Sequence, residues 1–416
     1  MPNDTTISVQ SLTDLTQAID RGRLAAVALP FATRQKILGA LAKTLKAAQD
    51  NILEANTLDL EASLEMAVPE LVIDWLRLTP DRLLNATTAL ERLQGLDIVA
   101  TPSGHRRVTL PSGGGAMTQG SWESLGVVAL VYEALPELSI FAAGLCLCTG
   151  NALILKGGNE ASQTNQALAE VFREVLSATA PSDDLIQVIS ARDGEAARRW
   201  LMQTPDLDLV IPYGRPSLIQ QVCREAQSPV LAPAMGNCYL YWAASGDVKT
   251  VVTAVIDSHR GQPDPVNAVE KVLVDAQVSD TAIAELQRQL QEANLRVERW
   301  TPEDLPRLDP DLWRQPFLQR TVWICPVPDI TTAIAWINRY SSGHGDAIVT
   351  HSYGESRQFI REVHSATLYV NQSPRFMRTP PTASSIALGM AAQRGIFRGR
   401  ITLDAFLTPK TIVHGA

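Results

Sequence analysis

The sequence predicts an α/β fold built from two doubly wound parallel sheets. Short, continuous apolar runs alternate with helical segments from Gly126 onward, which is the pattern of parallel strands covered by helices on both faces. These runs form two series, one on either side of about residue 255. The length of 416 residues exceeds what one small core needs and suits two or three domains.

Helices are expected before the first series. Over 34–62, apolar residues such as Ile37, Leu41 and Leu45 recur at helical spacing. A second helix is expected over 81–96, opened by Thr79-Pro80. The segment 99–122 is rich in Gly, Ser and Pro and predicts a loop or an exposed hairpin.

The apolar runs themselves define the expected strands and domains. The first series covers 127–132, 152–156, 185–189, 207–212 and 239–242. The second covers 271–274, 322–325, 347–350 and 366–370. We therefore expect a first domain over 1–255, a second over 256–375, and a C-terminal segment over 376–416 that returns to the first domain and the hairpin.

Composition excludes several classes of function. A formal net charge of −8 and a pI near 5.4 argue against nucleic acid or an anionic membrane as partner. No apolar run approaches the roughly 18 to 20 residues of a membrane span, and the polar N-terminus shows no secretion signal. The five cysteines form no paired framework, so a reduced, cytoplasmic protein is expected. The six histidines lack zinc-ligand spacing, so no metal is expected.

Several segments, taken in order, resemble one enzyme family. They are 52–56 (ILEAN) with 59–60 (DL), 78–82 (LTPDR), 125–127 (LGV), 132–134 (YEA), 150–161 (GNALILKGGNEA), 209–212 (LVIP), 235–238 (MGNC), 267–268 (NA) with Glu270, His344 with 346–350 (DAIVT), and 369–371 (YVN) with 375–376 (RF). On these residues the chain is similar to the γ-glutamyl phosphate reductase family, also called glutamate-5-semialdehyde dehydrogenase, of the aldehyde dehydrogenase superfamily. The similarity runs from about residue 34 to residue 413.

The resemblance carries expectations about fold and activity. It implies an aldehyde dehydrogenase-like fold with a small oligomerisation hairpin at 99–122, and hence a homo-oligomer. It also implies NADPH-dependent reduction of L-glutamate 5-phosphate to L-glutamate 5-semialdehyde and phosphate, a step of proline synthesis. That chemistry needs a thiolate to attack the acyl phosphate, donors for the oxyanion, and a nicotinamide that delivers hydride.

The nucleophile loop departs from the family pattern. That pattern reads roughly Arg-Pro-x-Val-Cys-Asn-Ala-x-Glu-Thr, whereas residues 262–271 read QPDPVNAVEK. Because Pro263, Asn267 and Glu270 keep the frame, Val266 stands where the attacking cysteine belongs. A valine has no lone pair to offer a carbonyl carbon. The chain is thus identified as a divergent copy without the catalytic cysteine, in which Val266 is a buried residue before a strand.

Other chemistry positions depart as well. Glu137 stands where the superfamily has the asparagine that helps to hold the oxyanion, and its carboxylate would repel the developing charge. Loss of one oxyanion donor typically costs about 100- to 1000-fold in rate. The remaining departures are Pro233 in place of a histidine, Tyr213 and Arg215 around Gly214 in place of Arg and Gly, and Gln393 in place of a glutamate.

A different cysteine could act as nucleophile only if its thiolate stood in an electropositive, accessible setting. Cys238 lies where the family also carries a cysteine that it does not use for attack. Nothing in the sequence places this thiol in such a setting, nor those of Cys146, Cys148, Cys223 and Cys325.

The cofactor side is closer to the family. Lys156-Gly157-Gly158 follows an expected strand and precedes a helix, where backbone N–H groups can hold an anion. In the superfamily the basic residue here contacts the adenosine ribose or its phosphate, so the resemblance makes Lys156 the NADP(H) candidate. Pro212 and Gly214 are further candidate cofactor positions. The alternative is a simple turn with a solvated lysine.

Asn371 and Arg375 are candidate substrate-binding residues, since a guanidinium can hold phosphate or carboxylate through two contacts. Arg375 matches the family. It lies in a basic cluster whose other members are solvated in the alternative interpretation: Arg378, Arg394, Arg398 and Arg400.

Three hypotheses about activity stay open. The first is a silent or strongly impaired family member that keeps the fold and a ligand site, as a subunit or regulator. The second is an active reductase in which hydride attacks the acyl phosphate directly, without a thioester. The third is a different dehydrogenase or binding activity on the same scaffold, with Glu133, Glu137 or Glu270 as base.

Overall fold

The computed structural model describes residues 6–27, 29–96, 117–260, 263–300, 311–382, 385–392 and 397–414. The chain divides into two compact units. The first comprises Met1–Ala232, Arg378–Leu388 and Ile401–Ala416, and the second comprises Pro233–Met377 and Gly389–Arg400. No helix in these described ranges is long and apolar enough to cross a bilayer.

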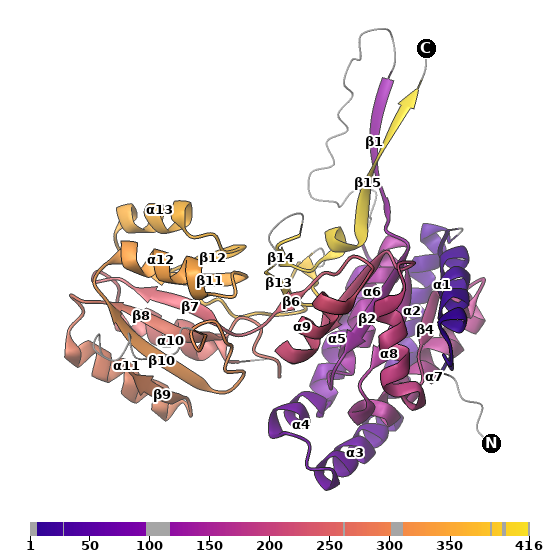
Figure 1. The fold of residues 1–416 in the computed structure, drawn as a ribbon, viewed down its shortest axis with the longest axis horizontal. Helices are drawn as coiled ribbons and strands as arrows, with labels where there is room; N and C mark the ends of the chain where they lie inside the picture. The colour runs from indigo at the N-terminus through magenta and orange to yellow at the C-terminus, as the bar shows by residue number, and fades with distance from the viewer. Residues whose placement is uncertain are drawn as a thin grey trace. The chain divides into compact units, whose positions relative to one another are not determined.

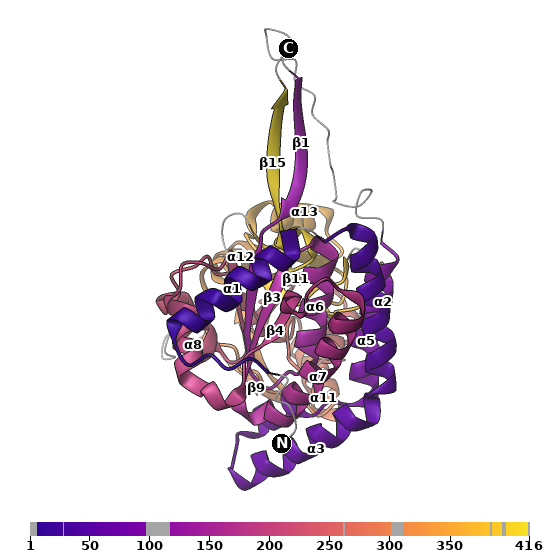
Figure 2. The ribbon, with the colours of Figure 1, turned by 90° about the vertical axis from the view of Figure 1, so that its right-hand side faces the viewer.

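The first unit, in which Figure 1 labels β2 and β4, is built on a parallel sheet of four strands in the order β4-β3-β2-β5. The strands are β2 (Val127–Tyr132), β3 (Ala152–Gly157), β4 (Ile186–Val188) and β5 (Leu209–Tyr213), all buried along their length. On one face, Val127, Ala129 and Val131 pack with helices α1 (Leu12–Val27), α8 (Gly194–Gln203) and α9 (Pro216–Glu225). Helices α6 (Glu137–Thr149) and α7 (Ser162–Thr179) cover the other face (Figure 2). The predicted sheet with helices on both faces is confirmed.

Between α1 and this sheet, the described residues form four more helices: α2 (Phe31–Ala47), α3 (Gln49–Glu65), α4 (Glu70–Leu76) and α5 (Pro80–Gln94). The single helix expected over 34–62 is wrong, because Ala48, with φ −88° and ψ 7°, separates α2 from α3. The expected start of α5 is confirmed. Thr79 Oγ1 accepts the N–H of Arg82 at 3.2 Å, and Pro80 occupies the first helical position, where no N–H is needed.

An antiparallel ribbon of two strands stands away from this sheet (Figures 1 and 2). It pairs β1 (Met117–Ser124) with β15 (Leu407–His414), from Met117 opposite His414 to Ser124 opposite Leu407. The expected hairpin at 99–122 falls partly outside the described residues, which omit 97–116. Its described part pairs with the C-terminal strand.

The second unit contains a parallel sheet of six strands in the order β12-β11-β7-β8-β10-β9. The strands are β7 (Cys238–Trp242), β8 (Val269–Asp275), β9 (Arg296–Arg299), β10 (Thr321–Val327), β11 (Gly345–Val349) and β12 (Thr367–Val370). Side chains alternate between two cores, as they must along a strand. Leu240 and Trp242 pack with α10 (Val248–Ser258) and α11 (Asp280–Glu292), whereas Tyr239 and Tyr241 pack with α12 (Ile330–Tyr340) and α13 (Tyr353–Glu362).

The pairing of strand β7 places the boundary between the units earlier in the chain than expected. It pairs with β8 and β11, so the run 239–242 belongs to the second sheet rather than to the first series. The second unit accordingly begins at Pro233, not near residue 256. The C-terminal segment is also divided, because β13 (Met390–Ala391) pairs with β6 (Pro233–Ala234) and β14 (Gly399–Arg400) of the second unit. A buried apolar run has the same sequence pattern in either sheet, so only its pairing partners show to which sheet the strand belongs.

Candidate functional site

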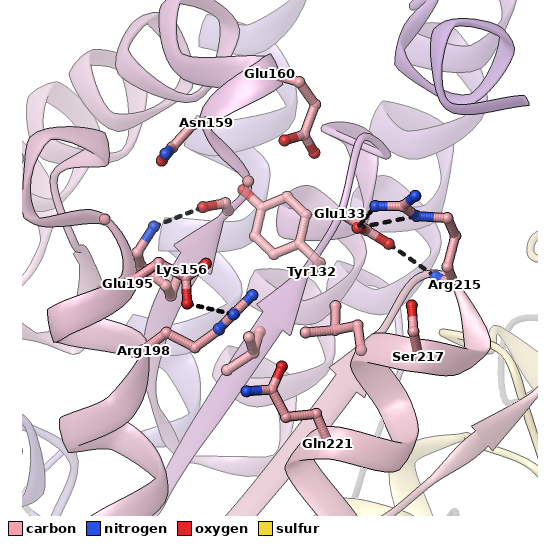
Figure 3. Close-up of a pocket in the computed structure, with 15 residues that line it drawn as sticks. Tyr132, Glu133, Lys156, Asn159, Glu160, Glu195, Arg198, Arg215, Ser217 and Gln221 are labelled. Atoms are coloured by element: carbon pink, nitrogen blue, oxygen red, sulfur yellow. Dashed lines mark hydrogen bonds and ion pairs between the residues drawn. The ribbon is translucent and has the colours of Figure 1, made fainter. Parts of the chain in front are cut away.

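The first unit holds a cavity of about 380 Å³ at the carboxyl ends of its strands (Figure 3). The strand order runs from β2 to β3 and β4 on one side and to β5 on the other, so β2 and β5 meet at a switch point, the usual ligand position in such sheets. The cavity is lined by Val131, Tyr132, Glu133, Lys156, Gly157, Gly158, Asn159, Glu160, Gly194, Glu195, Arg198, Arg215, Ser217, Leu218 and Gln221.

Lys156, Gly157 and Gly158 are thus brought into one cavity, as candidate cofactor residues should be. Lys156 is only 5% exposed, and its Nζ donates to the Gly157 carbonyl at 2.8 Å. Burial lowers the pKa of this amine, and the charge of Glu160 partly opposes that shift. A solvated lysine, the alternative from sequence, is therefore wrong. A Cβ on Gly157 would stand 2.2 Å from Asn165 Nδ2, so only glycine fits the end of β3.

Two ion pairs flank Tyr132 in the cavity (Figure 3). Arg198 pairs with Glu195 at 2.5 Å on α8. Arg215 donates three times to Glu133: its N–H to Oε2 at 2.9 Å, its Nε to Oε1 at 3.2 Å, and a terminal nitrogen to Oε1 at 2.7 Å. The hydrogen bonds that Arg215 donates to Glu133 raise the pKa of its guanidinium. Sequence reasoning did not place Arg198, Glu195 or Arg215 in the cofactor site.

The other two candidate cofactor positions lie beside the lining. Pro212 is on β5 opposite Val131 of β2. Gly214 follows β5, and a Cβ there would stand 2.7 Å from both Cβ and Oε2 of Glu133. Gly214 therefore allows Glu133 to lie against the turn that begins α9.

Glu160 ties the rim of the cavity to the chain after β2. Its Oε1 accepts the N–H of Ala134 at 2.7 Å, and Ala134 has a φ of 51°, a conformation that favours glycine. Burial raises the pKa of the Glu160 carboxyl, while the backbone N–H groups oppose this shift.

The nucleophile loop lies in the second unit, just before β8. Val266 is 2% exposed, and its carbonyl accepts from His344 Nε2 at 2.6 Å and from the Gly236 N–H at 3.1 Å. Burial lowers the pKa of His344 to about 4, so the imidazole is neutral. The predicted burial of Val266 before a strand is confirmed.

The residues that keep the loop in register are engaged in structural contacts. Asn267 Nδ2 donates to Pro374 O at 2.8 Å and Tyr369 Oη at 3.1 Å. The Glu270 carboxylate is fully buried and accepts the N–H groups of Asn237, Phe317 and Leu318 at 2.8 to 3.0 Å. Its burial raises its pKa, and Lys271 lies 3.3 Å away.

Cys238 lies close to this loop but is not activated. Its Sγ is 3.3 Å from His344 Nε2, which already donates to the Val266 carbonyl. Burial raises the pKa of the Cys238 thiol well above its ordinary value, and the negative charges of Asp346 and Glu270 add to the shift. Since a thiolate is the nucleophile, this fully buried thiol lies in a setting that disfavours attack on a substrate.

Glu137 is paired rather than free. It is 2% exposed, and Arg82 donates to it through Nε at 2.9 Å and through a terminal nitrogen at 2.5 Å to each carboxylate oxygen. The Glu137 carboxylate, which stands at the position of the oxyanion asparagine in the resemblance, is thus held in an ion pair with the guanidinium of Arg82. The pair joins α5 to the first turn of α6.

The candidate substrate residues make internal contacts. The Asn371 side chain accepts from the Thr350 N–H at 2.9 Å and donates to the Thr350 carbonyl at 2.8 Å. Arg375 pairs with Asp257 at 3.3 Å. Arg378 is buried and donates to Tyr213 Oη at 2.8 Å and to Leu388 O at 3.2 Å, so it is not solvated. Gln393 and Arg394 lie outside the described residues.

Glu133, Glu137 and Glu270 thus each hold close hydrogen-bond partners, which leaves none of them as an unengaged base. Within the described ranges, no three His, Cys, Asp or Glu side chains are grouped to hold a metal ion.

The two sheets and the cavity at the switch point define an aldehyde dehydrogenase-like protein. The sequence model of the aldehyde dehydrogenase family matches residues 5–303. Glyceraldehyde-3-phosphate dehydrogenase GapN from Methanocaldococcus jannaschii, solved as a complex with NADP, shares the fold with a TM-score of 0.71 at 15% identity, over 99% of this chain and 96% of that one.

Proteins with higher sequence identity to this chain show its family within that class. Gamma-glutamyl phosphate reductase 2 of Synechocystis is 42% identical over 394 residues, 92% of each chain. Gamma-glutamyl phosphate reductase of Gloeobacter violaceus is 34% identical over 419 residues, 96% of each. The crystal structure of the Thermotoga maritima reductase superposes with a TM-score of 0.85 at 27% identity, over 97% of this chain and 98% of that one. The chain belongs to the γ-glutamyl phosphate reductase family, as the resemblance predicted.

Proposed function

We propose that this chain is an NADP(H)-binding member of its family that does not carry out the family's reduction of L-glutamate 5-phosphate. The absence of this reduction is supported by the buried Val266 at the nucleophile position. The binding of NADP(H) rests on the cavity at the β2–β5 switch point. Its volume, about 380 Å³, lies within the range of ligand sites.

The residues of the cavity fit a phosphorylated dinucleotide. Lys156 and Arg198 supply positive charge beside β3 and α8, and the amino end of α9 presents its positive dipole end to the same space. A ribose 2′-phosphate would be recognised by Lys156 and Arg198, which favours NADPH over NADH. When bound, NADPH supplies the hydride of the family reaction.

Cofactor preference is measured by titrating the protein with NADPH and NADH and following nucleotide fluorescence. NADPH is expected to bind more tightly. Arg198→Gln should weaken NADPH binding by about tenfold, the value of one charge-assisted contact, and leave NADH unchanged. Arg199→Gln, on the same helix but outside the lining, is the matched control. Equal affinity for the two nucleotides, or none for either, would contradict the assignment.

Without a thiol at position 266, no covalent bond to the acyl carbon can form in this loop. The remaining loop contacts support a retained framework: His344 and Gly236 hold the Val266 carbonyl, and Asn267 is clamped by Tyr369 and Pro374. A substrate of the acyl-phosphate class would therefore meet a formed but unreactive loop.

The reaction is tested by following NADP+ reduction with glutamate 5-semialdehyde and phosphate. Wild type is expected to be inactive, and Val266→Cys to gain turnover, with Val266→Ala as a control for side-chain volume. Glu137→Asn should be added only after its stability has been checked, because it removes the partner of Arg82. Wild-type turnover would instead favour direct hydride attack on the acyl phosphate.

Two further assignments follow the same family expectations. The β1–β15 ribbon supports a homo-oligomer, since two strands alone are marginally stable in water and its edges are unpaired among the described strands. The five cysteines are all free thiols, which supports a reducing compartment, the cytoplasm.

A further inference from the structure

Arg215 lines the cavity at a position where the family pattern has glycine. Tyr132 of β2 lies opposite Tyr213 of β5 in the parallel sheet, so the residues that follow these strands leave the same sheet edge side by side. The Glu133 N–H continues the ladder by donating to Tyr213 O at 2.9 Å. Glu133 and Arg215 therefore face one another because of strand register, and both line the cavity.

The Glu133 carboxylate is bound as an anion would be. It takes the backbone N–H of Arg215, the residue that caps α9, together with Nε and a terminal nitrogen of the same side chain. Pro216 follows and has no N–H to offer. A forked guanidinium beside a helix amino end is a preferred arrangement for phosphate oxygens, and here a carboxylate of the chain occupies it.

The charged side chains that line the cavity balance one another. Three carboxylates, those of Glu133, Glu160 and Glu195, face three cations, those of Lys156, Arg198 and Arg215. The lining is thus formally neutral, although its proposed ligand carries several negative charges. Release of Arg215 from Glu133 would supply one cation, and the Arg215 side chain, at 42% exposure, has room to turn.

We propose that Arg215 is a phosphate-binding residue that Glu133 holds in an internal ion pair, and that a phosphorylated nucleotide binds by displacing the Glu133 carboxylate. This inference rests on the proposed cofactor function of the cavity. Glu133 acts as a competitor built into the site, which lowers the apparent affinity for the nucleotide. Gly214 makes the competition possible, since any side chain there would collide with Glu133.

The test is the dissociation constant of NADPH for wild type and three variants, measured by fluorescence at fixed ionic strength. Glu133→Gln should bind NADPH about tenfold more tightly, and Arg215→Gln about tenfold more weakly. The double variant should match Arg215→Gln, because Glu133 acts only through Arg215. Glu225→Gln removes a negative charge from the far end of α9 and should leave binding unchanged, as a control for bulk charge.

The outcomes separate the two proposals. Unchanged or weaker binding by folded Glu133→Gln, while wild type binds NADPH, overturns the competition and leaves the cofactor function standing. Absence of binding in wild type and in every variant overturns both. If Glu133→Gln fails to fold, the test rests on Arg215→Gln. An unchanged affinity of this variant for NADPH would show that the Arg215 guanidinium does not contact the phosphate, and would overturn the proposal. Binding of NADPH by Glu133→Gln but not by wild type would support the competition and contradict the proposed binding of NADPH by the unmodified chain.

Discussion

At position 266 the backbone is held firmly although the side chain has no reactive group. His344 donates to its carbonyl at 2.6 Å, and Gly236 donates to the same oxygen. His344 Nδ1 lies 2.9 Å from Ser342 Oγ, which fixes the ring from its other side. The histidine that the family keeps is therefore a loop support in this chain, and its neutrality is part of that role.

Stability should depend on pH through His344. Its folded pKa of about 4 lies below the ordinary 6.5, so the unfolded chain takes up a proton first as pH falls. The contribution is complete above pH 6.5 and is lost between pH 6.5 and about 4. Between pH 7 and pH 4.5, urea denaturation should show wild type losing about 2 kcal/mol more than His344→Gln.

Two considerations attribute this difference in stability to His344 rather than to another titrating group. Burial raises the pKa of Asp346 to about 6, and it titrates in the opposite sense, but it is common to both proteins and cancels in the difference. His364→Gln changes an exposed histidine and should follow wild type. Parallel pH profiles for wild type and His344→Gln would contradict a buried neutral imidazole.

The Arg82–Glu137 pair should show energetic coupling. Glu137 is 2% exposed and Arg82 13%, so removal of one partner strands a charge in a largely buried place. Glu137→Gln is expected to lower the free energy of unfolding by about 3 kcal/mol. Arg82→Met combined with Glu137→Gln should lose less than the sum of the single changes. Additive losses in this double-mutant cycle would show that the two side chains do not interact.

Residue roles were predictable where a local motif sets the geometry. Lys156 and Gly157 end strand β3, Gly158 follows them, and all three line the cavity, where the sequence motif placed them. Arg198 and Glu195 come from α8, whose amphipathic pattern carries no mark of a site. Arg375 meets Asp257, 118 residues away, and no local pattern reveals such a distant partner.

Among the elements, α7 depends on a cap from another helix. Asp59 of α3 accepts the N–H groups of Gln163 and Thr164 at 2.9 and 2.7 Å, and also the Thr164 hydroxyl. Asn56, one helical turn earlier, binds Leu76 O and the Leu78 N–H. These polar residues of the segments that resemble the family are buried connectors between helices.

Asp59→Ala should therefore destabilise the first unit. Loss of the cap leaves two helix N–H groups without their acceptor, at an expected cost of about 2 kcal/mol in the free energy of unfolding. Glu61→Ala, on the same helix and exposed, is the matched control and should change little. Equal effects of the two substitutions in urea denaturation would rule out the capping role.

The strands were predicted well because their apolar runs are continuous and bounded by helical segments. The sequence could not assign β7 to its sheet, since burial on both faces looks alike in either one. The break at Ala48 carries no Gly or Pro that would mark it. The partner of β1 is β15, close to 300 residues later, which is beyond the reach of turn signals.

On the scale of the whole molecule, the ribbon is the element that lacks a core of its own. Trp122 is 44% exposed and Val413 is 64% exposed, and Trp122, Pro409 and Val413 share one face by the strand register. Val413→Asp should therefore shift sedimentation from an oligomer to a smaller species, with Thr408→Asp on the opposite face as control. A monomeric wild type would contradict this role of the ribbon.

The candidate cofactor cavity and the nucleophile loop lie in different units, and they differ in how much of their chemistry remains. The cavity is lined by a buried lysine and two arginines, although Arg215 stands where the family pattern has glycine. The loop keeps its hydrogen bonds but carries Val266 in place of a thiol. Nucleotide binding and acyl transfer should therefore be separable in this protein.

Intact-protein mass spectrometry tests that separation most directly. Wild type and Val266→Cys are incubated with glutamate 5-semialdehyde and NADP+ without phosphate, so that any acyl-enzyme accumulates rather than being released. Val266→Cys should gain the mass of one glutamyl group with formation of NADPH, whereas wild type should remain unmodified. A glutamyl adduct on wild type, on Cys238 or any other residue, would contradict the account.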